Sequence, residues 1–208
     1  MVIVLPLLVA IKEYLGKYGD RSPDMEILCP CCGRRLRRHG RYFRNVVLGT
    51  ALYRVPVYRR LCPRCHRTFS LCPCFLRPYS QFALPVHEAA ARLLVQGRSP
   101  DGIAEHLCQG PETGGVSGRT ILRWQRRWKA GASDLLSSIS ERILSLSPGT
   151  DLTPYLPVPK MPRGSLQAVL SLGGLYRDMV WGSRHPSLFL FLRLSLPSAA
   201  VRPTTTAA

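Results

Sequence analysis

Acidic residues are scarce in this chain. Its 208 residues include only 12 aspartates and glutamates against 29 lysines and arginines, so the formal net charge is +17 at pH 7. Between Arg34 and Arg67 the sequence has eleven arginines and no carboxylate at all. Such an imbalance indicates a polyanionic partner or an anionic membrane surface.

Lysine is also rare, because 25 of the 29 basic residues are arginine and only four are lysine. Arginine makes the flat, bidentate contacts that phosphates and guanine edges accept. A genome rich in G and C could explain the ratio of arginine to lysine, but it would not explain the excess of base over acid.

Long hydrophobic runs are missing, and none approaches the ~20 apolar residues that a membrane-spanning helix requires. The apolar segment Met1–Ile11 has no basic start and no small-residue cleavage site, and Pro6 interrupts it. We therefore expect an edge strand or a short packing segment instead of a signal peptide. The expected location is the reducing cytoplasm, with no membrane partner.

Against this background the cysteines stand out, since four of them form two Cys-x-x-Cys pairs, Cys29 with Cys32 and Cys62 with Cys65. Each pair lets two sulfurs face one ion from a tight turn, and Gly33 lets the backbone curl so that amides face the sulfurs. Four thiolates are the tetrahedral donor set of a structural Zn²⁺. The 29 intervening residues suffice for a β-hairpin and part of a third strand, which predicts a zinc ribbon.

Other uses of the cysteines remain open. A disulfide framework needs an oxidising compartment, and a redox Cys-x-x-Cys usually stands once, beside a βαβ pattern. Cys31, Cys72 or Cys74 could replace one of the four ligands, but the two pairs repeat one local geometry. Cys72 and Cys74 are expected instead in an apolar join, Phe69–Tyr79. His66 directly follows a cysteine ligand and is a poor ligand itself.

The region between the two pairs has the pattern of a basic hairpin. Asn45–Thr50 contains the predicted turn, with Gly49 available for a positive φ. Leu52–Leu61 alternates as a strand does. One face would carry Tyr53, Val55, Val57 and Leu61, and the other Arg54, Tyr58 and Arg60. Arginines interleaved with rings, including Tyr42 and Phe43, suit contact with a nucleic-acid backbone. Alternatively, a ribbon this small simply exposes most of its residues.

After the ribbon the periodicity changes to that of helices. Pro85–Gln96 is a predicted helix that Gly97 closes. Ser99 would cap a second helix that starts at Pro100. Ser117 would cap a third helix, Gly118–Trp128, with Val116 and Ile121 placed as a hydrophobic staple.

The third predicted helix has two unlike faces. Ile121, Trp124, Gln125 and Trp128 share one face, and Arg119, Arg123, Arg126 and Arg127 share the other. Three short helices with an arginine-rich third one match a helix-turn-helix that binds double-stranded DNA. Arg119, Thr120 and Arg123 would reach base edges, whereas Arg126, Arg127 and Lys129 would reach phosphates. The candidate DNA-binding set is thus Ser117, Arg119, Thr120, Arg123, Arg126 and Arg127. An ordinary three-helix bundle with a solvated basic face is the alternative.

The remaining sequence predicts less. Ser133–Leu146 is a further amphipathic segment that would close the helical domain or form a homodimer contact. Residues 147–163 resemble a linker, Ser165–Leu172 is one candidate helix, Leu188–Leu196 is short and apolar, and residues 203–208 are expected to be disordered. The expected fold class is α+β. A segment 1–24 precedes a zinc ribbon at 25–77, a three- to four-helix helix-turn-helix domain at 78–146, and an irregular tail at 147–208.

Several of these motifs together resemble a known family. Cys29-Pro-x-Cys-Gly, the hairpin Arg38-His39-Gly40-Arg41-Tyr42, and Tyr58-Arg-Arg-Leu-Cys62-Pro-x-Cys65 are similar to the N-terminal zinc ribbon of bacterial insertion-sequence transposases. Gly97-Arg-Ser-Pro-Asp-Gly-Ile-Ala-Glu-His-Leu and Val116-Ser-x-Arg-Thr-Ile-x-Arg-Trp124 are similar to the helix-turn-helix that follows it. Small uncharacterised bacterial proteins share the same pairing.

The resemblance covers roughly residues 26–128. It implies that Cys29, Cys32, Cys62 and Cys65 bind Zn²⁺ and that the helix around Arg119–Arg127 binds DNA. The resemblance does not extend to catalysis. Such transposases cut DNA with three acidic residues on a ribonuclease-H-like core, and the resemblance does not include that core.

After Trp128 the chain has only four acids, at positions 134, 141, 151 and 178, and none sits in a convincing strand–helix frame. We therefore expect a DNA-binding protein, either transposon-associated or a transcriptional regulator, without enzymatic activity. The alternatives are a truncated or divergent transposase or nuclease, and a zinc ribbon that binds RNA or a protein.

Overall fold

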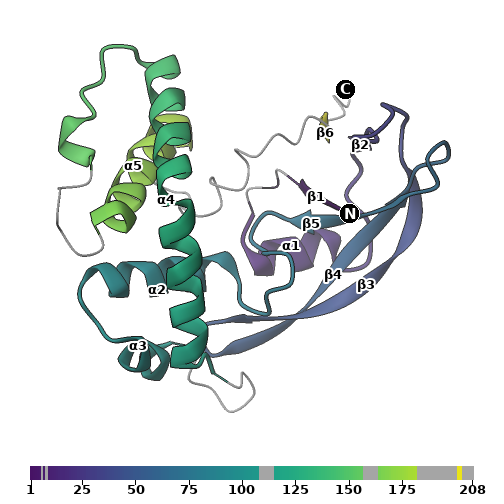
Figure 1. Cartoon of the computed structure of the whole chain (residues 1–208). Coiled ribbons are helices and arrows are strands. Elements are labelled where there is room, and N and C mark those ends of the chain that lie inside the picture. Colours follow the sequence, from purple (N-terminus) through teal and green to yellow (C-terminus); the bar gives the residue numbers. More distant parts are fainter. Residues whose placement is uncertain (6, 8, 108–114, 157–163, 182–200, 203–208) are drawn as a thin grey trace. The chain divides into compact units, whose positions relative to one another are not determined.

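The computed structural model describes residues 1–208 except 6, 8, 108–114, 157–163, 182–200 and 203–208 (Figure 1). It confirms the α+β class, with a four-stranded sheet, a two-stranded sheet and several helices. The described residues form two compact units. The first comprises Met1–Val47 and Leu52–Ala83 with Val201–Arg202, and the second comprises Leu48–Ala51 and the described residues from Leu84 to Trp181.

The first unit is built on a sheet with the strand order β1-β5-β4-β3. Its strands are β1 (Val2–Leu5), β3 (Arg37–Leu48), β4 (Ala51–Leu61) and β5 (Thr68–Pro73). Strands β3 and β4 form the predicted hairpin, and Gly49 takes a φ of 61° in its turn, where a side chain would be strained. Strands β4 and β5 are antiparallel, whereas β1 pairs parallel with β5 so that Val2 lies opposite Ser70.

The N-terminal segment therefore forms an edge strand, as the sequence predicts. Ile3 and Leu5 alternate with less buried neighbours and point into the core of this unit. Among the described helices of the chain, none is long and apolar enough to cross a membrane.

Helix α1 (Ile11–Tyr18) follows β1 and packs within the same unit. Tyr14 is fully buried, and its hydroxyl donates to the carbonyl of Pro56 on β4 at 3.2 Å. Burial raises the pKa of Tyr14 well above its usual range. The short strand β2 (Glu26–Ile27) pairs antiparallel with β6 (Val201–Arg202) and leads into the first cysteine pair.

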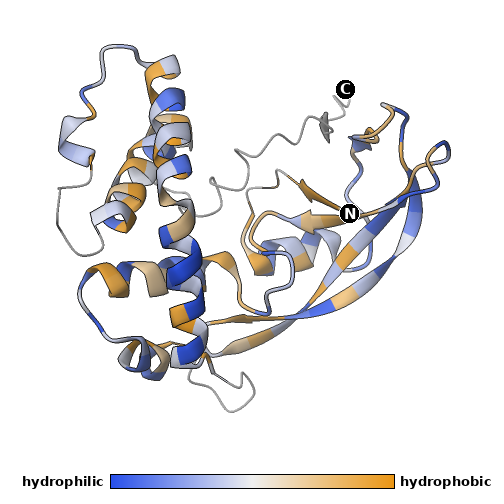
Figure 2. Cartoon of the chain, viewed as in Figure 1, coloured by the Kyte–Doolittle hydropathy of each residue, from blue (hydrophilic) through white to orange (hydrophobic). Residues whose placement is uncertain are grey.

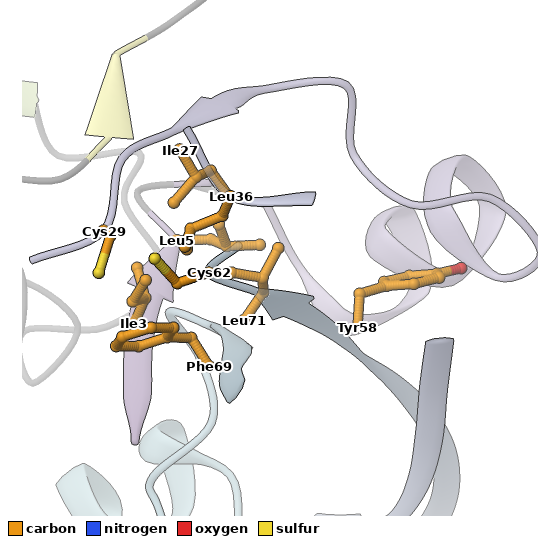
Figure 3. Packing of buried hydrophobic residues seen from close by; sticks show 9 residues of the cluster. All are labelled: Ile3, Leu5, Ile27, Cys29, Leu36, Tyr58, Cys62, Phe69 and Leu71. Atoms are coloured by element: carbon orange, nitrogen blue, oxygen red, sulfur yellow. The ribbon is translucent and has the colours of Figure 1, made fainter. Parts of the chain in front are cut away.

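The core of the first unit combines apolar side chains with cysteines (Figure 3). Its buried members are Ile3, Leu5, Ile27, Cys29, Leu36, Tyr58, Cys62, Phe69 and Leu71. Residues from β1, β2, β4 and β5 thus meet around two of the predicted metal ligands. The predicted metal ligands are therefore part of the hydrophobic core of this unit.

One face of β4 differs from the expectation. Tyr58 and Arg60 were expected on an exposed basic face, but they are only 6% and 5% exposed. The end of α1 and the chain after it cover them, because the Tyr58 hydroxyl donates to the Tyr18 carbonyl at 2.7 Å and the Arg60 guanidinium donates to the Pro23 carbonyl at 3.2 Å. Strand periodicity defines two faces but does not show that a preceding segment folds over one of them.

The second unit is helical. Its helices are α2 (Leu84–Val95), α3 (Pro100–His106), α4 (Gly118–Leu146), the 3₁₀ turn η1 (Thr153–Tyr155) and α5 (Gly164–Trp181). The residues predicted to begin or end these helices are confirmed. Gly97 has a φ of 92° after α2, the Ser99 hydroxyl accepts from the N–H of Gly102, and the Ser117 hydroxyl accepts from the N–H of Thr120.

Helix α4 is longer than predicted, because the segments Gly118–Trp128 and Ser133–Leu146 form one helix of 29 residues. No proline separates the two halves, and the apolar spacing continues through Gly131. Ile121, Trp124, Ala132, Ile139 and Ile143 are all buried along it. A single glycine weakens a helix by only about 1 kcal/mol, and packing along both sides of it compensates.

The expectation of an irregular tail from residue 147 is wrong for Gly164–Trp181, which forms α5. The predicted helix Ser165–Leu172 is its first part. Leu172 and Tyr176 of α5 pack with Ile139 and Ile143 of α4 in a second apolar cluster. The other expectations for the tail, at residues 188–196 and 203–208, lie outside the described residues.

The start of α4 lies close to Asp101 of α3 at Gly118. A Cβ added there would overlap the Asp101 carboxyl group and lie 3.3 Å from the Cα of Asp101. Gly131, in the middle of the same helix, has open space around it.

We expect Gly118→Ala to lower the free energy of unfolding by about 1–3 kcal/mol through overpacking. Gly131→Ala should raise it by about 0.5–1 kcal/mol through helix propensity. Urea unfolding of both variants, followed by far-ultraviolet circular dichroism, checks the opposite signs. If Gly118→Ala also stabilised the protein, the expected overpacking against Asp101 would be refuted.

Candidate metal centre and nucleic-acid interface

The four predicted ligands converge on one point in the first unit. The sulfurs of Cys29, Cys32, Cys62 and Cys65 all lie within 4.8 Å of one another, and Cys32 Sγ is 3.5 Å from Cys62 Sγ. A tetrahedron with metal–sulfur bonds of about 2.3 Å has edges of about 3.8 Å. The geometry therefore fits a single four-coordinate metal ion, and the prediction that these cysteines form one cluster is confirmed.

The two cysteine turns have the same backbone structure. In each turn the N–H of the first cysteine donates to the carbonyl five residues later, at 2.8 Å from Cys29 and 2.9 Å from Cys62. The N–H four residues after that cysteine donates back to its carbonyl, at 2.8 Å and 3.0 Å respectively. The two turns thus present their sulfurs from matching frames.

This frame gives His66 a role that the sequence reasoning missed. His66 holds a φ of 53°, and Gly33, at the equivalent place in the first turn, holds a φ of 71°. The left-handed conformation is strained for a residue with a Cβ and costs glycine nothing. The equal distance of Gly33 and His66 from their cysteines was the sequence signal that could have revealed it.

Hydrogen bonds make the thiols of the second turn unequal. The N–H of Cys65 donates to Cys62 Sγ at 3.3 Å and lowers the pKa of Cys62 to about 7. The hydrogen bond between the Cys65 and Cys32 side chains raises the pKa of Cys65 to about 12. Four thiolates this close repel one another, whereas a divalent cation would stabilise all of them together.

The other described cysteines lie apart from this cluster. Cys31 is exposed, and the Arg67 guanidinium approaches its sulfur at 3.5 Å. Cys72 and Cys74 are buried, and their thiols donate to the backbone carbonyls of Leu76 and Leu7. Burial raises the pKa of Cys74 to about 12, so this thiol stays protonated. Cys72 and Cys74 are therefore core residues, as the sequence predicts.

In the second unit, the first turns of α4 present the predicted arginines. Arg119, Arg123, Arg126 and Arg127 are exposed, Thr120 is partly exposed, and Ser117 is the exposed N-cap. The opposite side is anchored, because Ile121 and Trp124 are buried. The Trp124 ring lies 3.8 Å from the His87 ring of α2, centroid to centroid. Figure 2 shows the corresponding contrast of hydrophilic and hydrophobic residues along α4.

These four arginines of α4 have no carboxylate partner among the described residues. Four guanidinium groups on about three helical turns form a concentrated positive surface. Arginine at such positions can form bidentate hydrogen bonds with phosphate or with base edges.

A second basic surface lies on the hairpin of the first unit. Phe43 of β3 is 41% exposed, and the guanidinium groups of Arg41 and Arg54 lie 5.2 Å and 4.4 Å from its ring centroid. Its neighbour Tyr42 is 40% exposed. The expected mixture of rings and arginines is thus present on β3 and the first half of β4, although not at Tyr58.

Comparison with families of known proteins finds a similarity over part of the chain. A family model described as a domain of unknown function (DUF6431) matches residues 29–107, from the first cysteine of the cluster to the residue after α3. The matched region contains all four clustered cysteines, the β3–β4 hairpin, α2 and α3. No curated protein and no solved structure matches the chain.

We expect Cys65→Ser to lose the bound metal, because one of four thiolate donors is removed, while Cys31→Ser keeps it. Each substitution replaces one sulfur with oxygen, at Cys31 in the first cysteine turn and at Cys65 in the second, so Cys31→Ser is the matched control. Metal content by mass spectrometry of the purified proteins, at about one equivalent in the parent chain, provides the measurement. Metal loss in Cys31→Ser but not in Cys65→Ser would contradict the assignment of the ligands.

The strained position of His66 generates another prediction. His66→Gly should raise the free energy of unfolding of the metal-loaded protein by about 1 kcal/mol, and Gly33→Ala should lower it by a similar amount. Urea unfolding at constant metal concentration measures both. A loss of stability in both variants would show that His66 does not share the left-handed conformation of Gly33.

Proposed function

We propose that this chain is a zinc-containing protein that binds specific sequences of double-stranded DNA. The observation that carries the proposal is the arginine face at the start of α4, exposed and without carboxylate partners among the described residues, on a helix whose opposite face is buried. Its biological role would be that of a transcriptional regulator or a transposon-associated factor.

The donor set of the metal centre favours zinc. Four sulfur ligands in a tetrahedral arrangement are typical of structural Zn²⁺ sites, which hold small domains together. Cys29 and Cys62 lie in the core beside Ile27, Leu36 and Phe69. In this proposal the metal keeps the β3–β4 hairpin and the two turns in a zinc-ribbon arrangement.

The helices α2, α3 and α4 would act as a helix-turn-helix. Ser99 and Ser117 cap α3 and α4, Ile103 of α3 is buried, and α4 contacts both α2 and α3. In such motifs the N-terminal residues of the last helix lie in the major groove. Arg119, Thr120 and Arg123 would then contact base edges, and Arg126 and Arg127 would contact phosphates.

The acids after Trp128 support a binding protein better than a nuclease. Phosphoryl transfer needs carboxylates that converge on a metal ion. Here the Asp151 carboxylate accepts from the N–H of Thr153 at 2.9 Å at the start of η1, and the Asp178 carboxylate pairs with Arg177 at 2.7 Å. Asp134 and Glu141 are exposed on α4.

The test begins with selection of bound sequences from a random duplex pool, using the metal-loaded protein. We expect an enriched motif, and Arg123→Ala should weaken binding to it by about 1–3 kcal/mol while affecting random duplex much less. Arg126→Ala, on the same helix, should weaken both duplexes alike and lower the salt slope by about 1.

The ratio of affinities for the selected and random duplexes separates these roles. An unchanged ratio in Arg123→Ala, or enrichment of single-stranded RNA over duplex DNA, would refute the proposed reading of bases by α4. Metal-dependent nicking of DNA that disappears in Asp134→Asn or Asp151→Asn would instead favour a nuclease.

A further inference from the structure

An arginine-lined groove lies beside the metal centre in the first unit, away from the arginines of α4 in sequence. It has a volume of about 1050 Å³. Its basic lining residues are Arg34, Arg35, Arg37, Arg38, Arg60 and Arg64, and its acidic lining residue is Asp24. Two of them adjoin the cysteine turns, since Arg34 directly follows the first turn and Arg64 lies within the second.

Arg60 is the buried arginine of this groove. Its side chain is held by hydrogen bonds from one terminal nitrogen to Ser22 Oγ at 3.1 Å and to the Pro23 carbonyl at 3.2 Å. Its Nε–H group is buried and has no hydrogen-bond partner among the described residues. Burial, followed by the nearby charge of Arg38, lowers the pKa of Arg60, although arginine remains charged in proteins.

The chain supplies too little negative charge for this groove. Asp24 pairs with Arg38 at 3.4 Å, and Glu26 pairs with Arg35 at 3.8 Å. Within the described part of the chain, no carboxylate forms an ion pair with Arg34, Arg37, Arg60 or Arg64. Asp24 attracts Arg60 electrostatically but also pairs with Arg38, so it offsets the charge of the buried Arg60 only in part. A buried charge that is only partly offset is unfavourable, and so is a buried N–H without an acceptor. Both deficits would be met by one bound oxyanion.

We propose that this groove is a phosphate-binding site, with Arg60 at its base, that holds the backbone of a nucleic acid independently of its base sequence. A phosphate diester offers two unesterified oxygens to a guanidinium fork, and phosphates repeat along the strand at distances that several arginines can follow. The inference rests on the proposed binding of DNA, and it adds a second site in the other unit.

A polynucleotide suits the surroundings of the groove better than an isolated carboxylate would. Strand β3 begins at the groove with Arg37 and Arg38 and continues with Arg41, exposed Tyr42 and exposed Phe43. Successive positive charges with interspersed rings match a polymer of regularly spaced phosphates and bases.

The experiment compares two double variants of the full-length, metal-loaded protein that change net charge equally. Arg34→Ala with Arg64→Ala removes two exposed arginines from the groove. Arg21→Ala with Arg59→Ala removes two exposed arginines that do not line it. Binding to a labelled 30-base-pair random duplex is measured by fluorescence anisotropy at several salt concentrations, with metal content and circular dichroism as folding checks.

We expect the groove pair to lower affinity on the order of tenfold and to reduce the slope of log affinity against log salt by about 1.8, whereas the control pair changes either value much less. Arg60→Lys, which keeps the charge but loses the guanidinium fork, should also weaken binding while metal content stays unchanged.

Equal effects of the two pairs on the duplex would overturn the proposal, as would wild-type binding by Arg60→Lys. So would a groove pair that loses affinity for polyglutamate but not for the duplex, because the groove would then bind a carboxylate polymer. The selection experiment on α4 remains separate. If no motif is enriched but the groove pair loses duplex affinity, the proposed reading of bases by α4 fails and the phosphate site stands.

Discussion

The first unit depends on bringing four thiols within 4.8 Å of one another. Two of them, Cys29 and Cys62, are also members of the hydrophobic core, so the cluster and the core share residues. Their two turns are far apart in sequence, and each encloses its sulfurs with the same pair of backbone hydrogen bonds. A metal ion at this point would connect both turns and would offset the mutual repulsion of the thiolates.

The second unit depends on a single helix with two different faces. The buried face of α4 packs first against α2 and α3, where Trp124 meets His87, and then against α5 through Ile139 and Ile143. Because the apolar stripe supplies this packing, the opposite face is free to carry arginines whose mutual repulsion would otherwise weaken a helix. Stability and the proposed binding are thereby assigned to different sides of one element.

Both units carry concentrated arginine with little acid to neutralise it. On α4 the arginines are exposed and extend from a helix, which suits contact with base edges and phosphates. In the groove beside the cysteine turns, Arg60 is buried and held in place by Ser22 and Pro23, which suits a fixed oxyanion. A protein with a net charge of +17 would attract polyanions anywhere on its surface, and these two arrangements would give that attraction a defined geometry.

Local patterns determined much of this protein from the sequence alone. The Cys-x-x-Cys spacing, Gly49 in its turn, Gly97 after α2, and the caps Ser99 and Ser117 all act over a few residues, so their effects were predictable. Long-range packing decided the rest. It covered Tyr58 and Arg60 with the end of α1 and the segment after it, placed His66 in the conformation of Gly33, and joined two predicted segments into α4. It also paired α5 with Ile139 and Ile143, a contact between residues too distant in sequence for any local pattern to reveal.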